Sequence, residues 1–108
     1  MKKLLILSIL LAFIVLSCKK DSEETLYFPK VKSIVLANCT VCHTLGGQGM
    51  PVILETDEDI TSRATSIKET TIDPVSPQNK RMPQTGALTQ ADKDIILKWF
   101  EKGGKSTD

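Results

Sequence analysis

The chain has 108 residues, a length that fits one small domain. Its 14 Lys and Arg nearly balance its 13 Asp and Glu, so the composition indicates neither a basic nucleic-acid-binding surface nor an acidic solvating tail. Aromatic residues make up only 5% of the chain, so side chains alone would build a thin core. A buried cofactor would supply apolar surface that the chain lacks.

The first seventeen residues have the organisation of a secretory signal peptide. Lys2 and Lys3 precede an apolar run of about 13 residues, Leu4 to Leu16, and the small residue Ser17 follows it. This run is shorter than the roughly 20 residues that a membrane-spanning helix needs. We therefore expect residues 1–17 to be removed on export, which leaves 12 basic and 13 acidic side chains.

The cysteine after this run, Cys18, is a candidate for lipidation. Val15-Leu16-Ser17-Cys18 resembles a bacterial lipobox, in which the cysteine carries acyl chains and becomes the first mature residue. The alternative is an unmodified cysteine near a cleavage site. An acylated Cys18 would anchor the protein to a membrane, facing the periplasm or at the outer-membrane or cell surface. Residues 18–28 would then form a flexible tether.

The central motif, Cys39-Thr40-Val41-Cys42-His43, has the Cys-x-x-Cys-His spacing of covalent c-type haem attachment. One helical turn places both sulfur atoms on one face, where each can bond to a haem vinyl group. His43 is then positioned as an axial ligand of the iron. Covalent attachment of haem takes place outside the cytoplasm, in agreement with the signal peptide.

Hydrophobic periodicity predicts three helices around this motif. The first begins at Pro29 and runs to Asn38, so that it delivers Cys39 at its end. The second begins at the capping residue Thr56 and fades at Thr70-Thr71, and the third begins at Thr89 and stops at Gly103-Gly104. A glycine-rich loop and a long proline-rich loop connect them.

The second axial ligand is open to several candidates, because His43 is the only histidine in the chain. The sixth coordination position of the iron could hold a methionine, a lysine or an exogenous ligand, or it could stay empty. Met50 lies only 7 residues after His43, whereas Met82 lies 39 residues after it and precedes the stiffening Pro83. This separation lets the chain cross to the opposite face of the haem, so we favour Met82.

Three further positions have two interpretations each. A carbonyl near Pro51 can accept the second N–H of His43 and fix its tautomer, or the proline merely ends its loop. Lys80 and Arg81 beside the presumed ligand can pair with haem propionates or steer an acidic partner, or they are simply solvated.

The order of these motifs resembles a small class I cytochrome c domain. Cys39-Thr40-Val41-Cys42-His43, then Lys80-Arg81-Met82-Pro83, then a terminal helix with Trp99 are similar in particular to single-haem c-type lipoprotein domains of Bacteroidetes-like bacteria. The likeness covers roughly Val31 to Gly104.

This resemblance implies an all-α, cytochrome c-like fold of about three helices around one covalent haem c. It places the domain at 29–104, with a frayed C-terminus at 105–108. By this likeness Cys39 and Cys42 bind the vinyl groups, and His43 and Met82 bind the iron. Pro51 and Trp99 are expected to pack near the haem, with Trp99 or Phe100 placed where the first and last helices cross.

Three functions compete at this point. The favoured one is a non-enzymatic, membrane-anchored one-electron carrier with redox-protein donors and acceptors, either free or as a subunit of a larger respiratory complex. The second is a haem sensor or gas-binding protein with a labile sixth ligand. The third is a zinc site or redox pair without haem, but zinc wants four ligands and the chain has no second Cys/His pair.

Overall fold

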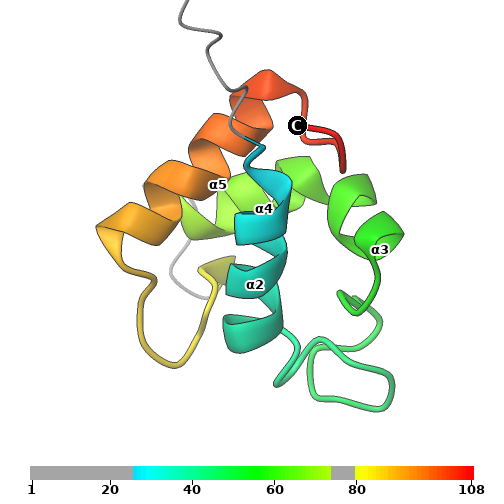
Figure 1. The fold of residues 1–108 in the computed structure, drawn as a ribbon. Helices are drawn as coiled ribbons and strands as arrows, with labels where there is room; N and C mark the ends of the chain where they lie inside the picture. Colours follow the sequence, from blue (N-terminus) through cyan, green and yellow to red (C-terminus); the bar gives the residue numbers. More distant parts are fainter. Residues whose placement is uncertain (1–25, 74–79) are drawn as a thin grey trace, which may run out of the picture.

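The computed structural model describes residues 26–73 and 80–108, and this part of the chain is all-α. Its helices are α2 (Phe28–Asn38), α3 (Asp57–Ser62), α4 (Ala64–Thr71) and α5 (Gln90–Lys102), with no strand among the described residues. Figure 1 shows α2 and α5 crossing in front of α4, with α3 at the side and the long loops at one end. The predicted helical class is confirmed.

Helix α2 confirms the predicted element before the Cys-x-x-Cys-His motif and starts one residue earlier than expected, at Phe28. Pro29 lies in its first turn, where a missing N–H costs no intrahelical hydrogen bond. Val31 and Val35 are buried on one face of the helix. The helix ends at Asn38, and Cys39 caps it by donating its N–H to Val35 O over 2.8 Å.

The second predicted helix is divided in two at Arg63. Thr56 and Asp59 form a complete capping box at the start of α3, as the sequence pattern indicates. The hydroxyl of Ser62 then donates to Asp59 O, and Arg63 N donates to Ile60 O over 3.2 Å, a tighter spacing than that of an α-helix. The interruption redirects the chain at Arg63 before α4 begins.

Helix α5 has the predicted bounds, with Thr89 as its N-cap and Gly103 just after its end. Gly104 adopts a left-handed φ of +68°, and a Cβ there would lie 2.7 Å from the Cβ of Ala64. This glycine therefore permits the close approach between the end of α5 and the start of α4.

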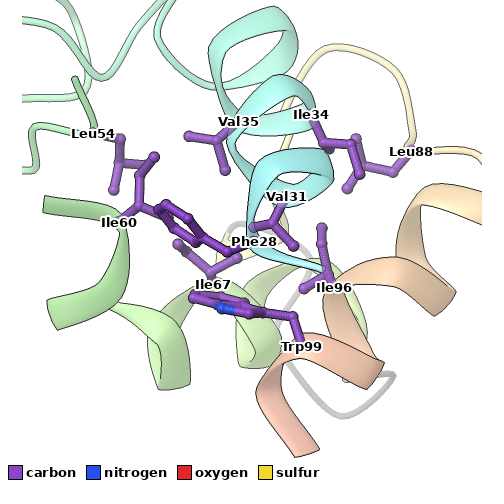
Figure 2. Packing of buried hydrophobic residues seen from close by; sticks show 10 residues of the cluster. All are labelled: Phe28, Val31, Ile34, Val35, Leu54, Ile60, Ile67, Leu88, Ile96 and Trp99. Carbon is purple, nitrogen blue, oxygen red and sulfur yellow. The ribbon is translucent and has the colours of Figure 1, made fainter. Parts of the chain in front are cut away.

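The core gathers ten buried apolar side chains from the helices and the two loops (Figure 2). Trp99 is completely buried, and its ring lies 6.0 Å from that of Phe28 where α2 meets α5. These side chains are Phe28, Val31, Ile34, Val35, Leu54, Ile60, Ile67, Leu88, Ile96 and Trp99. The whole core therefore lies within residues 28–99.

The two ends of the domain differ from the sequence-based expectation. The C-terminal residues 105–108 were expected to fray, but Asp108 O accepts from Tyr27 N and Phe28 N over 2.9 and 2.8 Å. Lys105 O accepts from the Trp99 indole over 2.8 Å. The C-terminal tail is therefore ordered, because it accepts hydrogen bonds from the free N–H groups at the start of α2. Phe28, which was expected in the tether, is part of the core.

Candidate functional site

The Cys-x-x-Cys-His motif forms a tight turn directly after α2. Cys42 N and His43 N both donate to Cys39 O, over 3.1 and 2.8 Å. The Cys39 side chain packs against the core, whereas Cys42 is exposed, and both are free thiols. Burial raises the pKa of the Cys39 thiol above its ordinary value, which favours the protonated thiol.

The imidazole of His43 is oriented by a backbone carbonyl. Its Nδ1 lies 3.1 Å from Val52 O, and because a carbonyl only accepts, Nδ1 carries the proton. Nε2 of the neutral ring is then unprotonated and able to bind a metal. The acceptor belongs to the residue after Pro51, which agrees with the expectation of a carbonyl near that proline.

Two glycines let the next loop pass close to the motif. A Cβ on Gly49 would lie 2.7 Å from Cε1 and 2.9 Å from Cγ of His43, so the backbone lies directly against the imidazole ring. A Cβ on Gly47 would lie 3.1 Å from the Cys42 carbonyl carbon. Gly49 N also donates to Cys42 O over 2.9 Å, and Leu54 N to His43 O over 2.9 Å. The loop therefore encloses His43.

Cys39, His43 and Met82 line one largely apolar pocket of about 160 Å³. The loop after the motif and α4 supply the other walls, which are Val52, Leu54, Arg63, Ser66, Ile67, Thr70 and Thr71. The hydroxyls of Thr70 and Thr71 donate to carbonyls of their own helix. Since these hydroxyls are engaged, they add little polarity to the pocket wall.

Met82 reaches this pocket from the loop that follows α4. Its N–H donates to Thr70 O over 2.9 Å, which ties the loop to the last turn of the helix. The side chain is half-buried. His43 and Met82 therefore line the same pocket, although 39 residues separate the two in the chain.

The remaining predicted site residues lie elsewhere. Met50 is 47% exposed and does not line the pocket. Pro51 is exposed, and Trp99 lies in the core at the crossing of α2 and α5, so neither lines the pocket where haem packing was expected. Lys80 and Arg81 are both exposed.

The predicted signal peptide 1–17, Cys18 and the predicted tether up to residue 25 lie outside the described residues. Within the described ranges no helix is long and apolar enough to cross a membrane. In the same ranges no three His, Cys, Asp or Glu side chains gather into a metal-binding group.

The structure adds residues that sequence reasoning missed. His43 is held by the Val52 carbonyl and the backbone of Gly49, and Met82 is held by the Thr70 carbonyl. No sequence motif predicts these contacts. Arg63 is the one cationic residue in the lining of the pocket that contains Cys39 and His43 but not Cys42.

Comparisons of the chain with protein-family models, with curated proteins and with solved structures found no match.

Proposed function

We propose that this protein is a membrane-anchored single-haem c-type cytochrome that carries one electron between redox proteins, with a small cytochrome c-like fold. The observation that carries the proposal is the meeting of Cys39, His43 and Met82 in one apolar pocket. The attachment motif and the best candidate for the second ligand come from distant parts of the chain. If the Cys-x-x-Cys-His sequence had arisen by chance on an unrelated helical domain, we would not expect it to share a pocket with that methionine.

The donor chemistry of the site fits haem. Cys39 and Cys42 would hold the vinyl carbons through thioether bonds, and His43 would bind the iron through Nε2, since Nδ1 is engaged by Val52 O. Met82 would supply the second ligand. When bound, haem supplies the redox-active iron, and the chain orients it and shields it from water.

The size of the pocket adds a requirement. At about 160 Å³ it is smaller than the roughly 300–1,000 Å³ of most cofactor sites. The pocket would therefore have to widen when haem is attached. Arg63 at the pocket wall would be placed to neutralise a propionate.

A carrier is favoured over a sensor because two protein ligands close the iron to small molecules. It is favoured over an enzyme because the lining lacks a group able to act as a base once His43 is bound to iron. A donor and an acceptor protein are the partners, and a lipid on Cys18 would hold the carrier at the membrane.

The test is to express the chain in a host that attaches haem and to measure the intact mass, the pyridine haemochrome and CO binding. We expect the mass of one haem, a c-type haemochrome, and no CO binding by the reduced protein without denaturant. Cys39→Ala should give a single thioether, and Cys39→Ala with Cys42→Ala should give none.

Two results would overturn the proposal. A colourless protein that retains zinc would assign the motif to a metal site without haem. An attached haem that binds CO readily would assign the protein to sensing or gas binding.

A further inference from the structure

One segment at an end of the domain carries no charged side chain of its own, although the neighbouring Glu55 carboxylate accepts a hydrogen bond from Thr44 within it. Residues 33–54 contain no Lys, Arg, Asp or Glu over 22 positions, although these types make up 25% of the chain. We call this segment the uncharged end. It comprises the last turns of α2, the Cys-x-x-Cys-His turn and the glycine loop, which project together from one end of the molecule (Figure 1).

The uncharged end also exposes large apolar side chains. Of the five that are exposed among the described residues, four belong to it: Leu36 at 44%, Val41 at 77%, Leu45 at 74% and Met50 at 47%. None of the four lines the pocket that holds Cys39, His43 and Met82. These four side chains therefore lie outside the pocket in which the haem would bind. Such a concentration of exposed apolar residues marks an interaction site.

We infer that the uncharged end is the docking surface for a redox protein that presents an apolar, uncharged face of its own. The exposed Cys42 lies between Val41 and the glycine loop, so a partner seated here is next to the attachment point of the haem. A charged partner face would lose its hydration without gaining an opposite charge, and such a partner is disfavoured. This inference rests on the proposed carrier function.

The membrane that holds the lipid anchor is less favoured than a redox protein as the partner of the uncharged end. The chain enters the domain at Leu26, just before α2, whereas the uncharged end lies at the other end of this helix. The eleven residues of α2 place the Cys-x-x-Cys-His turn about 16 Å from this entry point. A lipid-anchored domain would therefore present this surface away from its tether, toward partners in solution or in the same compartment.

Electron self-exchange tests the surface without a known partner, because a second copy presents the same apolar, uncharged face. The chain from residue 19 contains the entire core, so it is loaded with haem and mixed in its reduced and oxidised forms. Exchange rates are measured by NMR line broadening. Self-exchange has no driving force, so a substitution that shifts the potential does not by itself change the rate.

We expect Leu45→Asp and Val41→Asp each to lower the self-exchange rate at least tenfold at low salt, and added salt to restore part of it. Ala91→Asp is the matched control, because this exposed position lies in the first turn of α5 and adds the same charge. It should change the rate less than twofold. Unchanged visible spectra establish that each variant retains its haem site.

Rates for Leu45→Asp and Val41→Asp that equal the Ala91→Asp rate would overturn the docking surface. So would binding of the haem-loaded wild type to phosphatidylcholine vesicles that is lost in Leu45→Asp, which would assign the surface to a membrane. A stable dimer in sedimentation that dissociates in Leu45→Asp would assign it to a second copy. Absence of covalent haem would instead refute the carrier function, so the two failures are distinct.

Discussion

The position of the His43 ring depends on atoms that belong to no motif. The Val52 carbonyl orients the ring, and the backbone of Gly49 lies against it. Both contacts arise because the loop turns back on the Cys-x-x-Cys-His turn. Where a histidine binds haem iron, the hydrogen bond to its other ring nitrogen fixes the orientation of the imidazole.

Gly49→Ala tests this support. Its added methyl group would lie 2.7 Å from Cε1 of His43, so the ring or the loop must shift. We expect the free energy of unfolding of the haem-loaded protein to fall by about 1–3 kcal/mol, as for other overpacked sites. Denaturant titration measures the change. Gln48→Ala is the control at a neighbouring exposed position, and an equal loss in both variants would contradict the contact.

At the scale of elements, side-chain capping explains where α3 begins. Thr56 accepts from Asp59 N over 3.1 Å, and the Asp59 carboxylate accepts from Thr56 N over 2.9 Å. The hydroxyl and N–H of Thr56 hold the pKa of Asp59 below its ordinary value, helped by Glu55 N and the charge of Arg63. The two bonds together orient the first turn of α3.

Thr56→Ala should lower the free energy of unfolding by about 0.5–2 kcal/mol, because it leaves a helix N–H without its cap, while Thr56→Ser should retain most of it. Thermal and denaturant unfolding measure both variants. Equal stability of Thr56→Ala and the wild type would show that the cap is replaced by water.

The Asp59 carboxylate also predicts a dependence on pH. Its pKa is lower in the folded than in the unfolded chain, so its stabilising effect is complete above the unfolded value of about 3.9 and is lost as the pH falls through the folded value. Asp59→Asn should therefore lose less stability than the wild type between pH 5 and pH 2, by denaturant titration. The same acid sensitivity in both proteins would contradict this assignment.

Local patterns in the sequence predict the elements better than their connections. The bounds of α2 and α5 follow from Pro29, Thr89 and Gly103, whose effects are confined to neighbouring residues. The interruption at Arg63 depends on a competition between side-chain and backbone hydrogen bonds that periodicity does not detect. The ordered C-terminal tail depends on Asp108, which bonds to residues 80 positions away.

The residues of the candidate site also divide into those that a local sequence pattern predicts and those that it does not. The spacing of Cys39, Cys42 and His43 is a local signal, and Met82 is favoured over Met50 because its separation from His43 along the chain would let it reach the opposite face of a haem. Val52 O and Arg63 have no such signal, because their roles arise only when the glycine loop and α4 are brought together.

At the scale of the molecule, the core is small, and a covalent cofactor would add to it. All ten buried apolar side chains lie within residues 28–99, and the pocket opens between the motif and α4. A haem joined to the chain would fill this pocket with apolar surface and tie α2 to the loop that carries Met82. Stability and cofactor attachment should therefore be linked.

Blocking attachment tests this link. In Cys39→Ala with Cys42→Ala, we expect loss of covalent haem, with a midpoint of thermal unfolding lowered by at least about 10 °C, which corresponds to roughly 2 kcal/mol in a domain of this size. Circular dichroism against temperature gives the midpoint. Unchanged midpoints in the haem-loaded wild type and the variant would mean that the fold is complete without the cofactor.

The ligand set of the iron is the most direct test of the central claim. Visible spectra of the oxidised haem-loaded protein are recorded for the wild type, Met82→Ala and Met50→Ala. We predict a methionine-to-ferric-iron charge-transfer band that vanishes in Met82→Ala and survives in Met50→Ala, since Met82 lines the pocket of His43 and Met50 does not. A band that survives in Met82→Ala, or that only Met50→Ala removes, would contradict the proposed site.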